Sequence, residues 1–229
     1  MTTVSDAWRC SLQGRAAMLT FCKSGIFSLI LHDGGVRTPQ SSQSLSPDMT
    51  KYDETNRQFD SAMALCRDIF SRKLNDYGPS WRMMRPESIT DQIYIKAKRI
   101  RSLEIKKEAM VDEGILPEFI AIVNYGLVGL IQLRYGFADD VDMTSERALE
   151  LYDGFAVEAR KLMKAKNHDY DEAWRGMRIN SYTDLILTKL QRTKQIEDHS
   201  GKTEVSEGID SNYMDMVNYA VFGIIKLTE

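Results

Sequence analysis

Two lysine–arginine pairs are the residues best suited to chemistry in this sequence. Lys96 precedes Arg99 by three residues, and Lys189 precedes Arg192 by the same spacing. Residues three apart on a helix lie near one face, so each pair would present two cations to one anion. A phosphate group suits such a pair, because a guanidinium can bind two of its oxygens at once. We therefore interpret these four residues as a phosphate-binding set.

Both lysines interrupt the apolar face of the helix that is expected to carry them. The period that runs through Ile93 and Ile100 requires an apolar residue at Lys96, and Lys189 holds the same place in a later segment. A buried ammonium group is costly unless it is paired. Two explanations are open and compatible: a ligand phosphate meets the lysines, or acidic side chains form internal ion pairs with them.

Acidic residues near two strongly apolar helices are the candidate partners. These helices are expected over residues 119–133 and 213–227, with Glu118 just before the first and Asp215 within the second. Either carboxylate would pair with a lysine, or would act as a catalytic group that holds a metal or orients water. Asn124 and Asn218 are expected to fix these carboxylates. Mg²⁺ needs one or two carboxylates besides phosphate, and the best-placed candidates are Glu118, Asp215, Asp91 and Asp184.

Aromatic and arginine side chains complete the predicted site. The candidates for contact with a substrate are Tyr77, Tyr170, Trp81, Trp174, Arg82 and Arg175. The tryptophans would stack on a base, or serve as core residues. The arginines would bind phosphate or carboxylate groups, or would join helix ends to Asp91 and Asp184. The aspartates beside the tyrosines, Asp76 and Asp169, are candidates for metal ligands or for helix caps.

An internal duplication relates all of these residues. Residues 73–104 align without a gap to residues 166–197, at an offset of 93, and fourteen of the 32 positions are identical. Most of the identities are polar, charged or aromatic. A duplication kept for packing alone would preserve the apolar pattern and let polar identities drift, so the repeated element is expected to carry a site as well as a fold.

Each repeat is expected to contain three helices. The order is a helix, an Asp-Tyr turn, a second helix, a linker and a third, apolar helix, and the offset becomes 94 after the linker. No strand pattern is evident. Three-helix units with one apolar face each can bury it by pairing. The sequence therefore predicts an all-α, pseudo-twofold bundle, with a first repeat over residues 49–138 and a second over residues 139–229, packed as one domain.

The first 48 residues have no equivalent in either repeat. Gly34, Gly35 and a polar tract over residues 38–47 are typical of a poorly ordered extension. One interpretation is that these residues precede the true start of the protein at Met49. The alternative is a short helix over residues 16–31 that docks on the body.

Composition bounds the class of protein. The 229 residues include 43% hydrophobic and 28% charged residues, which is ordinary for a globular chain. A net charge of −3 gives no global attraction to nucleic acid or to acidic membranes, and we expect no apolar run to reach the ~18 residues of a membrane span. The three cysteines have no metal-ligand spacing, which fits reduced thiols in a cytoplasm.

These motifs resemble those of the nucleotide modification associated domain (type 1) family. The resemblance covers about residues 52–229, in a tandem form like that of Bacteroidetes proteins. It rests on the Asn75-Asp76-Tyr77-Gly78 turn, the Lys-x-x-Arg helix and the Asn124-Tyr125 pair, and on their second-repeat equivalents. Residues 95 and 188 are Ile and Thr where phage-type relatives have aspartate, residue 121 lacks the acid of the third helix, and residue 171 replaces the turn glycine.

The resemblance implies a role in nucleotide metabolism and a helical layout similar to the all-α nucleotide pyrophosphohydrolases. Two functions follow. The first is a nucleotide-binding helical protein that acts as a Mg²⁺-dependent (deoxy)nucleotide phosphohydrolase or as an accessory to nucleotide modification. The second is a non-catalytic interaction module, in which paired polar residues only fix the register of the two halves. The expected partner is a nucleotide or another phosphorylated small molecule, and self-association into a homo-oligomer is left open.

Overall fold

The computed structural model describes residues 11–12, 15–16, 49–106, 114–205 and 207–229. The chain divides into two compact units, Met1–Leu45 and Ser46–Glu229. In the first unit, β1 (Ser11–Leu12) and β2 (Arg15–Ala16) pair in antiparallel fashion. Apart from these four residues, the predicted extension over residues 1–48 and the alternative helix over residues 16–31 lie outside the described residues.

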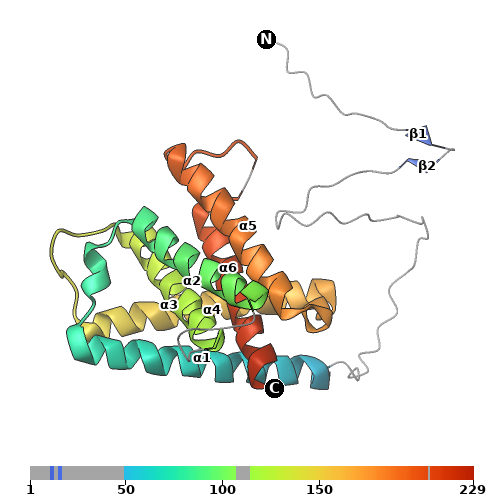
Figure 1. The fold of residues 1–229 in the computed structure, drawn as a ribbon, viewed down its shortest axis with the longest axis horizontal. Coiled ribbons are helices and arrows are strands. Elements are labelled where there is room, and N and C mark those ends of the chain that lie inside the picture. Colours follow the sequence, from blue (N-terminus) through green and yellow to red (C-terminus); the bar gives the residue numbers. More distant parts are fainter. Residues whose placement is uncertain (1–10, 13–14, 17–48, 107–113, 206) are drawn as a thin grey trace, which may run out of the picture. The chain divides into compact units, whose positions relative to one another are not determined.

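All regular elements in the described part of the second unit are helices (Figure 1). In chain order they are α1 (Met49–Tyr77), η1 (Ser80–Met83), α2 (Pro86–Lys106), α3 (Leu116–Tyr135), α4 (Ser145–Tyr170), η2 (Ala173–Gly176), α5 (Ile179–Asp198) and α6 (Ile209–Thr228). The first copy of the repeat, residues 49–138, holds α1 to α3. The second copy, residues 139–229, holds α4 to α6 in the same order, so the predicted all-α tandem arrangement is confirmed.

Local chemistry explains where the helices begin and end. The Thr144 side chain accepts a hydrogen bond from the backbone N–H of Arg147 at 3.2 Å and caps the start of α4. The Asp-Tyr pairs close α1 and α4, and the turn follows them one residue later than predicted. Gly78 takes a left-handed conformation there, with φ of +66°, and Asp171 takes the equivalent one with φ of +47°. Aspartate is one of the few other residues that tolerate this conformation.

The two apolar helices α3 and α6 form the centre of the bundle and make its most extensive contact. Glycines allow this close approach. A Cβ atom at Gly129 of α3 would lie 2.3 Å from the ring of Tyr213, and one at the equivalent Gly223 of α6 would lie 2.8 Å from the ring of Phe119. Each central helix therefore places one aromatic ring against a glycine of the other, as a twofold axis requires.

Length and composition would allow α3 to cross a membrane, which corrects the expectation that no run was long enough. However, 67% of its most apolar stretch is buried inside the protein. In the structure α3 packs against α1, α2, α4 and α6. A core helix of a bundle has this composition because it is covered on most sides.

Polar contacts between α2 and α5 repeat the twofold relation. Each contact joins a residue of one copy to a residue of the other, and exchanging the copies converts one contact into another. The set comprises Lys194 Nζ to Asp91 Oδ1 (2.5 Å), Arg101 Nη2 to Asp184 Oδ1 (2.7 Å), Thr90 Oγ1 to Glu197 Oε1 (2.5 Å) and Thr183 Oγ1 to Glu104 Oε1 (2.9 Å). Several of the polar identities between the repeats are thus explained by the interface that they form.

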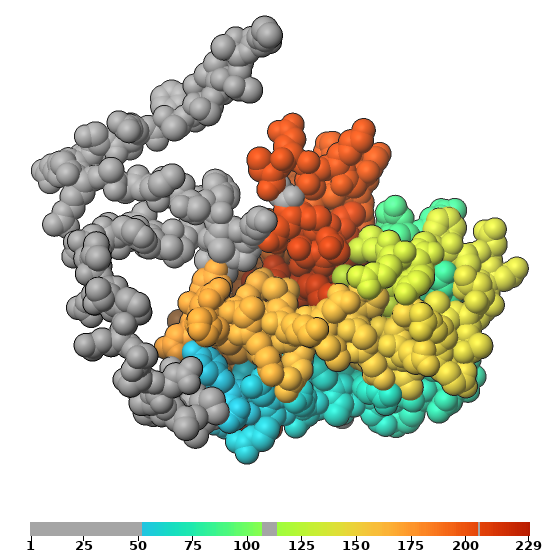
Figure 2. Space-filling view, turned by 180° about the vertical axis from the view of Figure 1, so that it is seen from behind, coloured from blue at the N-terminus to red at the C-terminus, as the bar shows by residue number. Residues whose placement is uncertain are grey.

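The outer helices α1 and α4 obey the same symmetry. Arg67 Nε lies 2.7 Å from Asp153 Oδ1, and Arg160 Nε lies 2.6 Å from Asp60 Oδ1. Figure 2 shows these two helices side by side, α1 in blue to green and α4 in orange and yellow. The two copies therefore pack against each other around an approximate twofold axis.

Candidate functional site

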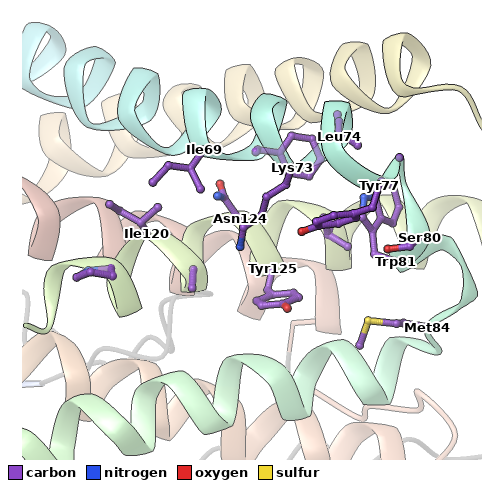
Figure 3. Close-up of a pocket in the computed structure, with 15 residues that line it drawn as sticks. Ile69, Lys73, Leu74, Tyr77, Ser80, Trp81, Met84, Ile120, Asn124 and Tyr125 are labelled. Carbon is purple, nitrogen blue, oxygen red and sulfur yellow. The ribbon is translucent and has the colours of Figure 1, made fainter. Parts of the chain in front are cut away.

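A cavity of about 300 Å³ lies in the first copy, between α1, η1 and α3 (Figure 3). Its wall is mainly apolar, with a few polar groups. The side chains that line it include those of Lys73, Tyr77, Trp81, Ala121, Asn124, Tyr125 and Val128. Figure 3 shows Lys73 and Tyr77 extending from α1 across the space towards α3. Small-molecule sites have this character: a concave apolar surface with a few fixed polar groups.

Three of the predicted substrate-binding residues meet at this cavity: Tyr77, Trp81 and Asn124. Trp81 is 9% exposed, and its indole Nε1 has no hydrogen-bond partner within the described residues. Tyr77 is 58% exposed, and partial burial together with its neighbour Tyr125 raises its pKa. Two tyrosine rings and an indole thus face a space that is open to a ligand.

The asparagines of the third helices are hydrogen-bonded to the first helix of their own copy. Asn124 Nδ2 donates to the carbonyl oxygen of Cys66 at 3.2 Å, and Asn218 Nδ2 donates to that of Ala159 at 3.2 Å. Asn124 Oδ1 also accepts a 2.7 Å hydrogen bond from the hydroxyl of Tyr152. The expectation that both asparagines fix Glu118 and Asp215 is therefore corrected: they fix the packing of α1 on α3 and of α4 on α6.

The predicted phosphate-binding residues of the first copy pair with a buried acid. Glu118 is 4% exposed, and its Oε2 lies 3.3 Å from Lys96 Nζ. Its other oxygen accepts a hydrogen bond from Arg99. The side chains of Lys96 and Arg99 keep 30% and 28% of their surface exposed. The internal ion pairs that formed the alternative interpretation are present here.

The equivalent lysine of the second copy is more deeply buried. Lys189 is 5% exposed and its Nζ lies 2.6 Å from Asp215 Oδ2, while Asp215 itself is 2% exposed. The other oxygen of Asp215 accepts a hydrogen bond from Lys166. Arg192 is exposed and does not join this ion pair. Burial raises the pKa of the nearby Tyr219; the charge of Asp215 raises this pKa further, and the charge of Arg192 lowers it.

Side-chain size separates the two copies at the cavity. Val128 lines the space in the first copy, and its equivalent in the second copy is Phe222. The ring of Phe222 stacks on Trp174, with centroids 4.3 Å apart and an interplanar angle of 6°. The face of Trp174 is thus covered by its own chain, whereas the equivalent position beside Trp81 carries only a valine. Tyr170, which was predicted with Tyr77 to contact a substrate, is the last residue of α4, as Tyr77 is of α1.

Arg82 holds the loop after the first copy. It is 2% exposed, with Nε 2.8 Å from Asp142 Oδ1 and Nη1 2.6 Å from the carbonyl oxygen of Gly136. Gln132 accepts a further hydrogen bond from it and donates to the carbonyl oxygen of Met84 at 2.5 Å, which fixes η1. The hydrogen bond from Arg82 lowers the pKa of Asp142.

Arg175 has a similar structural role in the second copy. Its Nε lies 2.9 Å from Glu172 Oε2, its Nη2 donates to Gln58 Oε1 at 2.7 Å, and it also contacts Thr55. It thereby ties η2 to α1. These partners correct the expectation that the arginines reach Asp91 and Asp184.

The four carboxylates predicted to hold Mg²⁺ each have a cationic partner. Glu118 and Asp215 pair with the lysines and Arg99, and Asp91 and Asp184 pair across the α2–α5 interface. Within the described ranges, no three His, Cys, Asp or Glu side chains form a group that could hold a metal. These pairs do not favour a magnesium centre, so Mg²⁺ binding stays a prediction and we derive no hydrolytic step through it.

Lys73 and Tyr125 line the cavity, but sequence reasoning did not assign either of them to a site. Lys73 is one of the fourteen identical positions, and Tyr125 belongs to the repeated Asn-Tyr pair, so both carried a signal. Lys73 has no ion-pair or hydrogen-bond partner in the part of the chain that the structure describes. It is therefore the cation most available to a ligand in the cavity.

The fold and the cavity together define an all-helical, internally duplicated protein with a small-molecule pocket in its first copy. A comparison with models of protein families identifies the family of the chain. The model of nucleotide modification associated domain 1 matches residues 73–133 and again residues 166–227, together just over half of the chain. The chain belongs to this family, in a tandem form. No curated protein and no solved structure matched it.

Proposed function

We propose that the protein binds a nucleotide and that the cavity of the first copy holds its base. The observation that carries this proposal is the aromatic-walled space beside Trp81, at a position where the second copy places Phe222 on Trp174. An aromatic ring of the chain's own stacks there in one copy, so a flat aromatic ligand suits the other.

The size and lining of the cavity agree with this assignment. Its volume of about 300 Å³ lies at the small end of the range for ligand pockets. Tyr77, Tyr125 and Trp81 supply aromatic surface, while Lys73 supplies a positive charge. A base would occupy the apolar part, and a phosphate would extend towards the lysine. Membership in a family associated with nucleotide modification supports the same ligand class.

Thermal unfolding with a panel of nucleosides and nucleotides tests the proposal. A ligand at 100 times its dissociation constant adds about 2.7 kcal/mol of stability, so at least one compound should raise the Tm of the natural chain. Val128→Phe, which installs the residue of the second copy, should remove that shift because it fills the cavity. Val157→Phe is the matched control, since Val157 is 52% exposed on α4. Flat curves for the natural chain, or an unchanged shift in Val128→Phe, would contradict the proposal.

A second candidate function is the non-catalytic interaction module. The observation in its favour is that many repeated polar residues, including Asp91 and Asp184, are used in contacts between the copies. On this account the repeated motifs hold the domain together and the cavity has no ligand. The same nucleotide panel distinguishes the two, because a module of this kind predicts no ligand-dependent Tm shift.

Hydrolysis is a separate question from binding. The predicted catalytic residues, Glu118 and Asp215, are both neutralised by cations of the same copy. We therefore propose binding without assigning a bond that is broken. Incubation of the nucleotide that gives the largest Tm shift with the protein and Mg²⁺, followed by separation of the products, tests the predicted phosphohydrolase activity.

A further inference from the structure

The second copy contains an acid at a position where the first copy has none. With the offset of 94 in the third helices, Asp215 is the equivalent of Ala121, which lines the cavity. With the offset of 93 in the earlier helices, Lys166 and Lys189 are the equivalents of Lys73 and Lys96. The two copies therefore share both lysines and differ in the carboxylate.

The structure supports this register. Equivalent asparagines of α3 and α6 make equivalent 3.2 Å hydrogen bonds to backbone carbonyls of α1 and α4, at Cys66 and Ala159. The first and third helices of each copy are thus packed in the same way. The lysine of the second helix also reaches an acid on the third helix in both copies, but at different positions, because Glu118 aligns with Asn212 and Asp215 aligns with Ala121. The asparagine contacts therefore establish the register, and the acids are where the two copies differ.

In the second copy the carboxylate joins the two lysines. Asp215 accepts from Lys166 with one oxygen and lies 2.6 Å from Lys189 with the other. An oxyanion between two ammonium groups is also the arrangement in which proteins hold a phosphate group. In this copy, Asp215 itself therefore pairs with both Lys166 and Lys189.

In the first copy the same place is open. Ala121 has no acidic group, Lys73 has no partner within the described residues, and Lys96 reaches Glu118 at 3.3 Å, one turn earlier on α3. Lys96 shares the Glu118 carboxylate with Arg99, whereas Lys73 lines the cavity with no acidic partner within the described residues. A phosphate monoester carries about −1.5 to −2 charges at pH 7, so it would supply the negative charge that Asp215 supplies to the equivalent lysines of the second copy.

We infer that the carboxylate of Asp215 marks the position that the phosphate of a nucleoside monophosphate takes in the first copy, between Lys73 and Lys96. This inference rests on the proposed nucleotide binding and names its phosphate subsite. The ligand places its base beside Trp81 and its phosphate beside Ala121, and Lys96 turns from Glu118 towards it. The second copy is closed by Asp215 and Phe222 and keeps only a structural role.

Calorimetric titration with a nucleoside and with its 5′-monophosphate, at one ionic strength, tests the inference. Charge-assisted hydrogen bonds from two lysines should make the monophosphate bind about tenfold tighter or more. Lys73→Met and Ala121→Asp should each reduce this ratio towards one, because each should weaken binding of the monophosphate more than binding of the nucleoside. Ala121→Asn, which has the size of aspartate without its charge, should keep more of the ratio. Lys164→Met, at an exposed lysine of α4, is the control for Lys73→Met.

The outcomes separate the inference from the proposed function. If the natural chain binds neither compound, both fail. If it binds both compounds equally, or if Lys73→Met and Ala121→Asp keep the full ratio, the phosphate subsite is wrong and the base site stands. Ala121→Asp should fold, because the second copy accepts aspartate at this position between the same lysines; if it does not fold, the ratio in Lys73→Met decides.

Discussion

Removal of the Asp215 carboxylate should destabilise the protein strongly. Asp215 is 2% exposed and Lys189 is 5% exposed, so Asp215→Ala leaves an ammonium group buried without its partner. Removing one member of a buried pair costs about 3–5 kcal/mol, mainly because the remaining charge is uncompensated. Lys166, whose side chain is 29% exposed, can return to water and adds little to this loss. Single domains have a total stability of about 5–15 kcal/mol, so the change is a large fraction of it.

The assay is equilibrium unfolding in urea, followed by circular dichroism. The free energy of unfolding falls linearly with urea, so the loss appears as a lower midpoint at an unchanged slope. Glu118→Ala is the matched control in the first copy. Its partners Lys96 and Arg99 keep 30% and 28% of their surface exposed, and their charges are more easily hydrated. This variant should therefore lose less stability than Asp215→Ala.

A second substitution separates the buried charge from simple loss of packing. In Asp215→Ala/Lys189→Met no unpaired charge stays in the interior, so the double variant should recover much of the stability that the single variant loses. A loss below about 1 kcal/mol in Asp215→Ala, the range of exposed pairs, would refute the reasoning. So would a double variant that is no more stable than the single one.

Three further predictions follow from single contacts. Burial raises the pKa of Glu104 above its ordinary value near 4.5, so the carboxyl group binds a proton more tightly in the folded state than in the unfolded state. The resulting stabilisation is present below the pKa of the unfolded state and is lost as pH rises through the pKa of the folded state. Glu104→Gln should therefore weaken the pH dependence of urea midpoints as pH rises above about 4.5, and an unchanged profile would contradict this. Phe59 is the equivalent of Tyr152, whose hydroxyl donates to Asn124 Oδ1, whereas Asn218 Oδ1, the equivalent acceptor, has no hydrogen-bond partner within the described residues. Phe59→Tyr should therefore add about 0.5–1.5 kcal/mol to the free energy of unfolding in the same assay. A loss of stability would mean that the hydroxyl does not fit. Gly129→Ala should cost about 1–3 kcal/mol by overpacking, because the new Cβ would lie 2.3 Å from the ring of Tyr213; a neutral effect would show that α3 and α6 can separate there.

The duplication made the fold predictable from the sequence. An apolar period that recurs at a fixed offset indicates repeated helices whose faces must be buried against each other. Thr144 caps the first turn of α4, which begins at the next residue. The helix expected over residues 119–133 begins three residues earlier, at Leu116, because Pro117 is accepted in the first turn of a helix.

The polar identities were harder to interpret. The sequence indicated that Asp91 and Asp184 are constrained, but only the structure shows that each pairs with a cation of the other copy. A residue retained to hold two halves together and a residue retained to bind a ligand give the same signal within one chain. The arrangement of α2 against α5 had to be known to separate them.

The cavity depends on a difference that no motif carries. Val128 and Phe222 are both apolar residues in the same period, so the pattern treats them alike. Their volumes differ by most of an aromatic ring, and this difference decides whether the face of the tryptophan is open or covered. The contrast between Ala121 and Asp215 was visible in the sequence, but its meaning required the positions of the lysines.

The stoichiometry of binding tests the central claim most directly. Calorimetric titration of the natural chain with a nucleoside 5′-monophosphate should give one site per chain, and Val128→Phe should abolish it while the protein stays folded. Two sites per chain would contradict the claim that the first copy alone is open, and so would one site that survives Val128→Phe.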